Sequence, residues 1–198
     1  MIKAIFFDVG GVLVEDNSAG IFTRHARLLG IDRDRLITVM RPDRRLLSKG
    51  LISHREYLRR LSARFGIPPI RVADIRSVMP RRYRRVHSMW AIARLLRRRG
   101  YRIGVITNVP PPLPFRPELR LHPLFSVVVR SFAVGSVKPE KRIFDIARRR
   151  AGVKFLEMLF FDDKPRNVTA AKYLGIKAFV YKNPRQLVRQ LRRYGVRI

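Results

Sequence analysis

The chain has 198 residues, hydrophobic side chains make up 46% of it, and it contains no cysteine. This length and apolar share suit one globular domain with a real core, and the missing cysteines exclude disulfides, thiolate metal sites and thiol catalysis. No run approaches the ~18 apolar residues of a membrane span, and no signal-peptide pattern precedes the first predicted strand, so we expect a cytoplasmic protein.

The charge of the chain is far from balanced. Lys and Arg number 44 against 14 Asp and Glu, which gives a formal net charge of +30. Self-repulsion on this scale opposes compaction and favours counter-ions or an anionic partner. Two interpretations stay open: a nucleic acid or other polyanion as partner, or an arginine-biased host composition on solvated faces. No recognisable nucleic-acid-binding motif is present, and aromatic residues among the basic clusters are sparse.

The first predicted strand carries the first candidate site residue. Residues 3–14 form an apolar run that contains Asp8 and, shortly after it, Gly10 and Gly11. Such a run, rich in aromatic and β-branched residues, predicts a strand buried on both faces in the middle of a parallel sheet. A buried carboxylate is tolerated where a cation or several donors face it, so Asp8 indicates a site at the carboxyl edge of the sheet. A buried Asp that only caps a turn is the alternative.

The segment after this strand is predicted to be all helical. Helical spacing of apolar residues predicts helices at about 21–29, 32–47, 53–65 and 69–79. Ser53 and Glu56 form a capping-box pattern that opens the third of them. We therefore expect a helical cap domain over residues 15–81, inserted into an α/β core domain made of residues 1–14 and 82–198.

From residue 82 onward, helices and strands alternate. Strands are predicted at 102–107, 126–129, 158–161 and 178–180, and helices at about 86–96, 139–147, 167–174 and 185–194. Pro139 suits the first turn of its helix, and a proline-rich loop is predicted at 109–117. Together with the first strand, this alternation predicts an open, doubly wound parallel sheet of five strands, with its ligand site beyond the carboxyl ends of the strands.

Polar side chains follow the predicted strands at the edge where their carboxyl ends meet. They are Asp8 after the first strand, Thr107 and Asn108 after the second, Lys138 beyond the third, and Asp162 and Asp163 after the fourth. Oxygen ligands at this density suit Mg²⁺, which commonly works beside a substrate phosphate. A hydroxyl and an ammonium group are what the remaining oxygens of a phosphoryl group need around them.

Four motifs resemble, in order and spacing, those of the haloacid dehalogenase (HAD) superfamily. They are Phe7-Asp8-Val9-Gly10-Gly11-Val12, Val105-Ile106-Thr107-Asn108, Lys138-Pro139-Glu140 with Ile143-Phe144, and Phe160-Phe161-Asp162-Asp163 with Asn167. The resemblance covers essentially the whole chain, including a helical insertion where the family's helical cap belongs. It implies a Rossmann-like core with a helical cap and a hydrolase that forms a phosphorylated aspartate.

The resemblance also implies roles for the catalytic residues. Asp8 would be the nucleophile and form a transient aspartyl phosphate, which water then hydrolyses. Thr107, with the backbone of Asn108, would hold the phosphoryl oxygens. Lys138 would neutralise charge on Asp8 and on the phosphoryl group.

For the metal, the resemblance implies a Mg²⁺ ion bound by Asp8 and by the backbone carbonyl of Gly10. Asp162 would complete the set with Asp163, the latter directly or through water. Asn167 stands where the family often has a carboxylate beside the metal ligands.

One position departs from the family pattern. HAD phosphatases generally carry a second Asp two residues after the nucleophile, which protonates the leaving oxygen, and here that residue is Gly10. General-acid catalysis is typically worth ~10²- to 10⁴-fold in rate. Alkyl phosphates are therefore expected to be poor substrates unless another donor stands in, and Glu15, Asp16 and His54 are the candidates.

Three functions stay open at this stage. The first is a Mg²⁺-dependent phosphatase of small phosphorylated metabolites, similar to small sugar-phosphate phosphatases and to the N-terminal domain of epoxide hydrolases. The second is a catalytically weak HAD-fold protein that binds RNA or another polyanion. The third is a 2-haloacid dehalogenase, against which the pair Asp162 and Asp163 argues because it would repel a carboxylate substrate. Neither the substrate nor the oligomeric state follows from the sequence.

Overall fold

The computed structural model describes residues 1–16, 18–69, 71, 84–112 and 123–198. Its centre is a five-stranded parallel sheet with the strand order β3-β2-β1-β4-β5. The strands are β1 (Ala4–Phe7), β2 (Arg102–Thr107), β3 (Val127–Arg130), β4 (Met158–Asp162) and β5 (Lys177–Val180). β1 lies in the middle and all of its residues are buried. The predicted doubly wound α/β fold is confirmed.

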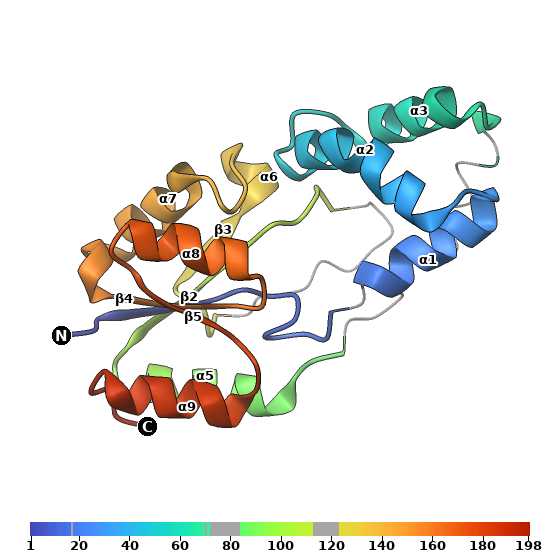
Figure 1. The fold of residues 1–198 in the computed structure, drawn as a ribbon. Coiled ribbons are helices and arrows are strands. Elements are labelled where there is room, and N and C mark those ends of the chain that lie inside the picture. The colour runs from blue at the N-terminus through green and yellow to red at the C-terminus, as the bar shows by residue number, and fades with distance from the viewer. Residues whose placement is uncertain (17, 70, 72–83, 113–122) are drawn as a thin grey trace.

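Helices cover both faces of this sheet (Figure 1). α5 (His87–Arg98) and α9 (Pro184–Arg193) lie on one face, and α7 (Lys141–Ala151) and α8 (Pro165–Tyr173) lie on the other. Alternate side chains of β1 enter the two resulting cores, Ile5 and Phe7 the first, Ala4 and Phe6 the second. A continuous apolar strand is what this two-sided burial requires. No helix in the described ranges is both long and apolar enough to cross a membrane.

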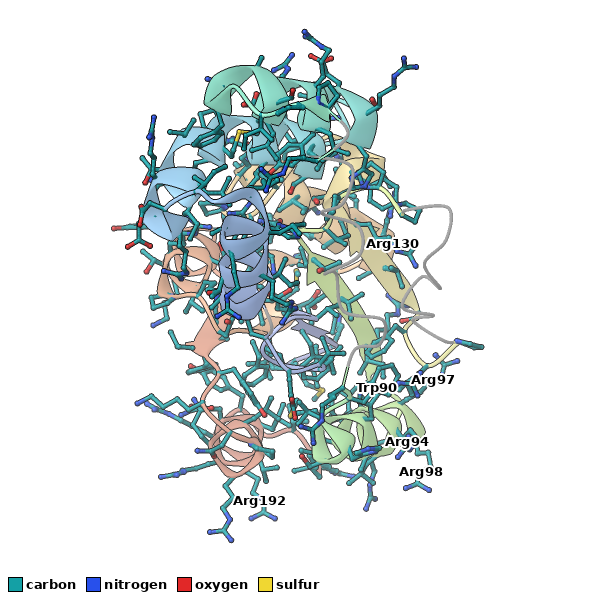
Figure 2. The ribbon with its side chains drawn as sticks, turned by 90° about the vertical axis from the view of Figure 1, so that its right-hand side faces the viewer. Trp90, Arg94, Arg97, Arg98, Arg130 and Arg192 are labelled. Carbon is teal, nitrogen blue, oxygen red and sulfur yellow. The ribbon has the colours of Figure 1, made fainter. Side chains whose placement is uncertain are left out.

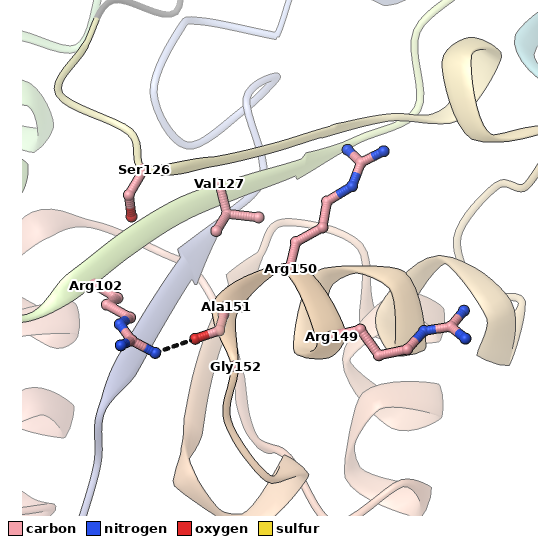
Figure 3. A pocket seen from close by; sticks show the side chains of 7 residues that line it. All are labelled: Arg102, Ser126, Val127, Arg149, Arg150, Ala151 and Gly152. Atoms are coloured by element: carbon pink, nitrogen blue, oxygen red, sulfur yellow. Dashed lines mark hydrogen bonds between the residues drawn. The ribbon is translucent and has the colours of Figure 1, made fainter.

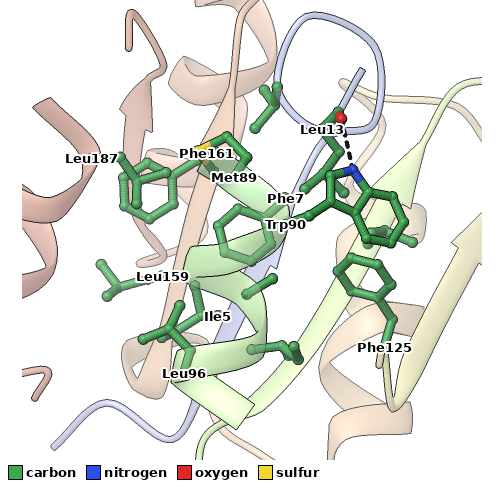
Figure 4. Close-up of a cluster of buried hydrophobic side chains, with 14 of the residues drawn as sticks. Ile5, Phe7, Leu13, Met89, Trp90, Leu96, Phe125, Leu159, Phe161 and Leu187 are labelled. Atoms are coloured by element: carbon green, nitrogen blue, oxygen red, sulfur yellow. Dashed lines mark hydrogen bonds between the residues drawn. The ribbon is translucent and has the colours of Figure 1, made fainter. Parts of the chain in front are cut away.

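The core under α5 and α9 also fixes the segment that follows β1 (Figure 4). The indole nitrogen of Trp90 donates a hydrogen bond of 2.9 Å to the carbonyl oxygen of Leu13. The ring of Trp90 packs edge-on against Phe125, with 5.6 Å between ring centroids. Because residues 9–14 directly follow Asp8, these contacts hold the turn beyond the candidate nucleophile against a rigid helix.

Three helices between β1 and α5 form a lobe with its own core. They are α1 (Ser18–Leu29), α2 (Arg33–Ser48) and α3 (His54–Phe65), and we call residues 18–65 the helical lobe. The buried hydrophobic side chains that pack together in this core are Ala26, Leu29, Leu36, Met40 and Leu61. Asp32 and Ser53 cap α2 and α3 as predicted, although Glu56 binds Arg59 and Arg60 instead of closing the capping box. The helix predicted over 69–79 lies almost entirely outside the described residues.

The predicted start of α7 at Pro139 is wrong. The helix begins at Lys141, because Glu140 has an extended backbone (φ −63°, ψ 137°). The amide of Glu140 donates to the carbonyl oxygen of Val137 at 2.8 Å, which closes a turn before the helix. Lys138 therefore lies in a tight turn and not on a helix. A short helix, α6 (Ser131–Val134), also follows β3 without having been predicted.

Gly104 in β2 shows how closely the sheet is packed. A Cβ atom there would lie 2.5 Å from Cε1 of Phe6 and 2.8 Å from the carbonyl oxygen of Val127. The Val127 backbone belongs to β3 and cannot move without disturbing strand pairing, so we expect Gly104→Ala to lower the free energy of unfolding by about 1–3 kcal/mol. The measurement is urea denaturation.

A matched control is Gly20→Ala in α1, where, of the described side chains, the added Cβ atom would meet only the end of Arg24, at 3.5 Å. It should be neutral or raise the free energy of unfolding by up to ~1 kcal/mol, because Ala has a higher helix propensity than Gly. Equal stability of the wild type and Gly104→Ala would contradict the packing described for the sheet.

Candidate active site

The centre of the candidate site is a lysine between two carboxylates. Asp8 directly follows β1, and its backbone N–H donates to the carbonyl oxygen of Phe161 at 2.8 Å. The Lys138 Nζ lies 2.9 Å from Oδ1 of Asp8 and 2.6 Å from Oδ2 of Asp162, the last residue of β4. Lys138 is 2% exposed and Asp162 is fully buried. The structure thus brings together three charged side chains that are far apart in the sequence. All three are buried, so each charge is stabilised by the opposite charge beside it.

Asn108 fixes the backbone that carries this lysine. Its Oδ1 accepts a hydrogen bond of 2.8 Å from the N–H of Lys138, and its Nδ2 donates to the Lys138 carbonyl oxygen at 2.9 Å. The paired contact ties the turn around residue 138 to the end of β2. Motif reasoning gave Asn108 only a backbone role and missed this one, because the partner lies 30 residues away.

Asp162 is held by donors on both oxygens. Its Oδ1 accepts from the backbone N–H of Lys164 at 2.8 Å and from Nδ2 of Asn167 at 2.9 Å. Its Oδ2 accepts from Lys138. Asn167 lies in the first turn of α8 and is 3% exposed. The turn from β4 into α8 therefore sets the orientation of the Asp162 carboxylate.

The carboxylate of Asp163 has fewer hydrogen-bond partners than that of Asp162. Its Oδ2 lies 2.7 Å from Nζ of Lys164, whereas its buried Oδ1 has no hydrogen-bond partner among the described residues. The backbone of Gly11, with φ of +75°, runs so close that a Cβ atom there would lie 2.7 Å from Cγ of Asp163. Only glycine tolerates both this dihedral angle and this approach. A buried carboxylate oxygen of Asp163 is thus left without a hydrogen-bond partner among the described residues.

These carboxylates suit a hard divalent cation. Asp8, Asp162 and Asp163 each offer an oxygen, and the oxygens lie within 4.8 Å of one another. Burial raises the pKa of Asp8 to about 6, the Lys138 ammonium opposes this effect, and the Asp162 charge adds to it. A bound cation would favour the ionised carboxylates and give the Asp163 Oδ1 atom a partner. An all-oxygen set of this kind is what Mg²⁺ prefers.

Two further predicted residues leave room for a ligand. Thr107 ends β2 and is 8% exposed, and no partner for its hydroxyl is found in the described part of the chain. A Cβ atom added at Gly10 would meet no atom of the described residues within 4 Å. The site therefore has a hydroxyl to offer and open space at the position where the family pattern has an acid.

Each of the three candidate proton donors already has a partner. Asp16 binds Lys164 at 3.0 Å and Glu15 lies 3.5 Å from Arg84. The Nε2 atom of His54 lies 2.8 Å from the carbonyl oxygen of Pro111. Because a carbonyl only accepts, this nitrogen carries a hydrogen that is already donated. None of the three stands ready as a replacement acid.

A shallow pocket of about 290 Å³ lies at the opposite edge of the sheet (Figure 3). No carboxylate of the described residues lines it, and the Arg102 guanidinium donates to the carbonyl oxygen of Ala151. Figure 3 shows the side chains of Arg149 and Arg150 pointing away from Arg102. These groups do not converge on a common ligand, so the candidate site stays at the carboxyl edge.

The carboxyl edge of this doubly wound parallel sheet carries an aspartate, a lysine and an aspartate pair. This arrangement defines an α/β enzyme whose site lies at the end of the first strand. The model of the haloacid dehalogenase-like hydrolases matches residues 2–175, and the chain belongs to this family.

Two curated relatives are named as phosphatases. A Mycobacterium tuberculosis phosphatase is 36% identical over 87 residues, which are 42% of this chain and 40% of that protein. A sesquiterpene phosphatase of Aspergillus oryzae is 25% identical over 178 residues, which are 88% of this chain and 87% of that protein. The chain thus matches less than half the length of the mycobacterial relative.

Solved structures with the same fold include both phosphate complexes and dehalogenases. A HAD family enzyme of Bacteroides thetaiotaomicron in complex with magnesium and inorganic phosphate has a TM-score of 0.63 at 21% identity, covering 92% of this chain and 95% of its own. A 2-haloacid dehalogenase of Pseudomonas syringae has a TM-score of 0.70 at 20% identity, covering 98% and 100%. At these identities the likeness concerns the fold alone.

Proposed function

We propose that the protein is a Mg²⁺-dependent phosphatase of small phosphorylated metabolites that works through a phosphorylated Asp8. The observation that carries this proposal is the Lys138 ammonium between Asp8 and Asp162, with a carboxylate oxygen of Asp163 within 4.8 Å of an oxygen of each of these two aspartates. The curated relatives named as phosphatases, and the magnesium and phosphate bound to a protein of the same fold, support it.

In this proposal Asp8 supplies the nucleophilic oxygen. Its attack on phosphorus forms an acyl phosphate and breaks the bond to the leaving oxygen, and water then attacks phosphorus and frees Asp8 and inorganic phosphate. Lys138 offsets the negative charge of Asp8 and of the phosphoryl group, and the Thr107 hydroxyl donates to a phosphoryl oxygen. Mg²⁺, held by Asp8, the Gly10 carbonyl, Asp162 and Asp163, would supply charge neutralisation for the phosphoryl oxygens.

We also propose that the helical lobe belongs to a cap domain of residues 15–81, set on a core domain of residues 1–14 and 82–198. Glu140, two residues after the site lysine, binds Lys49 at 2.7 Å and also binds Arg45. The buried Ser131 hydroxyl lies 2.6 Å from the carbonyl oxygen of Ser48. These contacts anchor the end of α2 beside the site, where a cap can exclude water.

Hydrolysis of p-nitrophenyl phosphate should depend on a divalent cation. We expect EDTA to reduce the rate by roughly 100-fold or more, because charge stabilisation by a metal is worth several kcal/mol. Excess Mg²⁺ should restore it, while circular dichroism confirms that chelation leaves the fold intact. Full activity in EDTA would contradict the proposal, and chloride release from 2-chloropropionate in the same buffer would favour a dehalogenase.

Polyanion binding is a second candidate function, favoured by two arginine-rich helices on one face of the sheet. The helices α5 and α9 carry Arg94, Arg97, Arg98, Arg185, Arg189, Arg192 and Arg193 and contain no Asp or Glu. Arg94, Arg97, Arg98 and Arg192 lie on this side of the molecule in Figure 2. Guanidinium groups match phosphate geometry. None of the named relatives points to a nucleic-acid partner.

A fluorescently labelled RNA duplex tests this second function. If the face binds it, affinity should fall steeply as salt rises, and each of Arg189→Ala and Arg192→Ala should reduce the salt slope by about 1. Absence of binding at low salt would leave host composition as the source of the arginines.

A further inference from the structure

The carboxylate of Glu140 closes the turn that carries the site lysine. Its Oε2 accepts a hydrogen bond of 2.9 Å from the Ser136 hydroxyl and one of 3.3 Å from the backbone N–H of Val137. Ser136 is fully buried. Glu140 thus holds the two residues that directly precede Lys138, whereas Asn108 holds the backbone of Lys138 itself.

The other oxygen of this carboxylate binds the helical lobe. The Oε1 atom lies 2.7 Å from Nζ of Lys49 and also binds Nη2 of Arg45. Burial alone would raise the pKa of Glu140, but hydrogen bonds from Lys49 and Ser136 outweigh burial and hold this pKa below its usual range. Glu140 is therefore ionised at neutral pH, and its two oxygens join the lysine turn to the lobe.

The end of α2, residues 45–49, also contacts the segment that follows Thr107. The buried Ser131 hydroxyl lies 2.6 Å from the carbonyl oxygen of Ser48 and accepts a hydrogen bond of 2.9 Å from the N–H of Val109. Figure 1 shows this end of α2 beside α6, the helix that begins at Ser131. One part of the lobe is therefore attached to two of the segments that carry the candidate site.

We propose that Glu140 is a positioning residue of the reaction, which fixes the place of Lys138 and couples it to the end of α2. This inference rests on the proposed phosphatase function and deepens it. Glu140 acts through the turn and not on the substrate, so its contribution should be the same for every phosphate ester. Because a misplacement of about 1 Å can cost ~100-fold in rate, a loosened turn should lower kcat.

Substitutions of Glu140 measure this contribution with two substrates of different size, acetyl phosphate and p-nitrophenyl phosphate. Glu140→Ala should lower kcat by roughly 10- to 100-fold for both, with KM changed by less than about threefold. Glu140→Gln keeps an oxygen for Ser136 and Val137 but loses the charge that binds the lobe, so we expect a loss of roughly 3- to 10-fold. A loss confined to KM, or to one substrate, would overturn the inference.

A double-mutant cycle separates positioning from stability. The pair Lys49→Met and Arg45→Met should lower kcat about as much as Glu140→Gln does. Added to Glu140→Gln, the pair should lower kcat no further, because changes that remove one shared contact are not additive. The charge-conserving pair Lys49→Arg and Arg45→Lys should retain most of the wild-type kcat. The lobe variants leave Glu140 in place, so the test does not depend on the folding of one variant.

Glu157 provides a matched control at the opposite edge of the sheet, directly before β4. Its side chain is 21% exposed, against 24% for Glu140, and it binds Lys3 at 2.6 Å. It also accepts a hydrogen bond of 2.8 Å from a backbone N–H three residues earlier, that of Lys154. Glu157→Gln and Lys3→Met should lower stability in urea about as much as the changes at Glu140 and Lys49, and should keep the wild-type kcat.

Hydrogen exchange tests the coupling without any enzyme assay. In the full chain, the peptide that contains residues 136–140 should exchange roughly 10-fold faster in the variant Lys49→Met with Arg45→Met than in the wild type, because the turn opens more often once Glu140 is released from the lobe. Exchange of this peptide should be unchanged in Lys3→Met. Mass spectrometry of the digested protein gives both rates.

Three outcomes would overturn the inference in distinguishable ways. If both substrates are hydrolysed but the lobe pair changes neither kcat nor exchange, Glu140 does not couple the lobe to the lysine, and the phosphatase proposal stands. If exchange rises while kcat is unchanged, the contact is structural only. If the wild type hydrolyses neither substrate with Mg²⁺ present, the proposed function fails and the positioning role fails with it.

Discussion

Replacing Asp8 by Asn should abolish phosphate hydrolysis and leave the fold intact. An amide oxygen cannot form the acyl phosphate, and loss of a catalytic nucleophile typically costs at least ~10⁴-fold in kcat. The substitution keeps the size of the side chain. Lys138 also keeps its contact of 2.6 Å with Asp162, so it is not left as an unpaired buried charge. The measurement is the steady-state rate with an aryl phosphate at saturating Mg²⁺.

The matched control for this substitution is Asp145→Asn on α7. Asp145 binds Arg148 at 2.9 Å on the surface of that helix and has no part in the site. It should retain the wild-type rate, and thermal unfolding of both variants should show a single cooperative transition. Hydrolysis by Asp8→Asn at the wild-type rate would mean that another group attacks phosphorus.

Gly10→Asp should raise the turnover of alkyl phosphates by roughly 10²- to 10⁴-fold, the usual contribution of a general acid. A Cβ atom at Gly10 would meet no atom of the described residues within 4 Å, and the φ of Gly10 lies outside the left-handed region, so a side chain can start there without strain. The change should be smaller for aryl phosphates, whose leaving groups need less protonation. Rates with glycerol phosphate and p-nitrophenyl phosphate measure the contrast.

Gly10→Asn separates acid catalysis from any effect of side-chain size, because the Asn side chain has nearly the same shape as Asp but no acidic proton. It should give no gain with glycerol phosphate. If Gly10→Asp gives no gain either, the site lacks more than its acid, and the protein is better described as a HAD-fold protein that has lost efficient catalysis.

The sheet follows from the sequence because its signals are local. Each strand is a short apolar run, and β1 needs no alternation since Ile5 and Phe6 point into different cores. The helix caps at Asp32 and Ser53 depend on residues three positions away. Such patterns are visible in one stretch of chain. The start of α7 was misplaced because a turn around Pro139 competes with the helix.

The candidate site can be predicted less completely from the sequence, because the contacts that support it join segments that are far apart in the chain. The motifs indicate Asp8, Lys138 and Asp162, whose side chains the structure brings together. They do not reveal that the Asn108 side-chain amide forms two hydrogen bonds with the backbone of residue 138. Nor do they reveal which arginines of the helical lobe bind Asp43 or Glu56, since this depends on how the lobe folds.

The phosphorylated aspartate itself can be detected. Enzyme turning over a radiolabelled aryl phosphate is quenched in acid at short times, digested and mapped by mass spectrometry. The account predicts a hydroxylamine-sensitive label on the peptide that contains Asp8. Label on any other residue, or phosphate release with no label at Asp8 at any quench time, would contradict it.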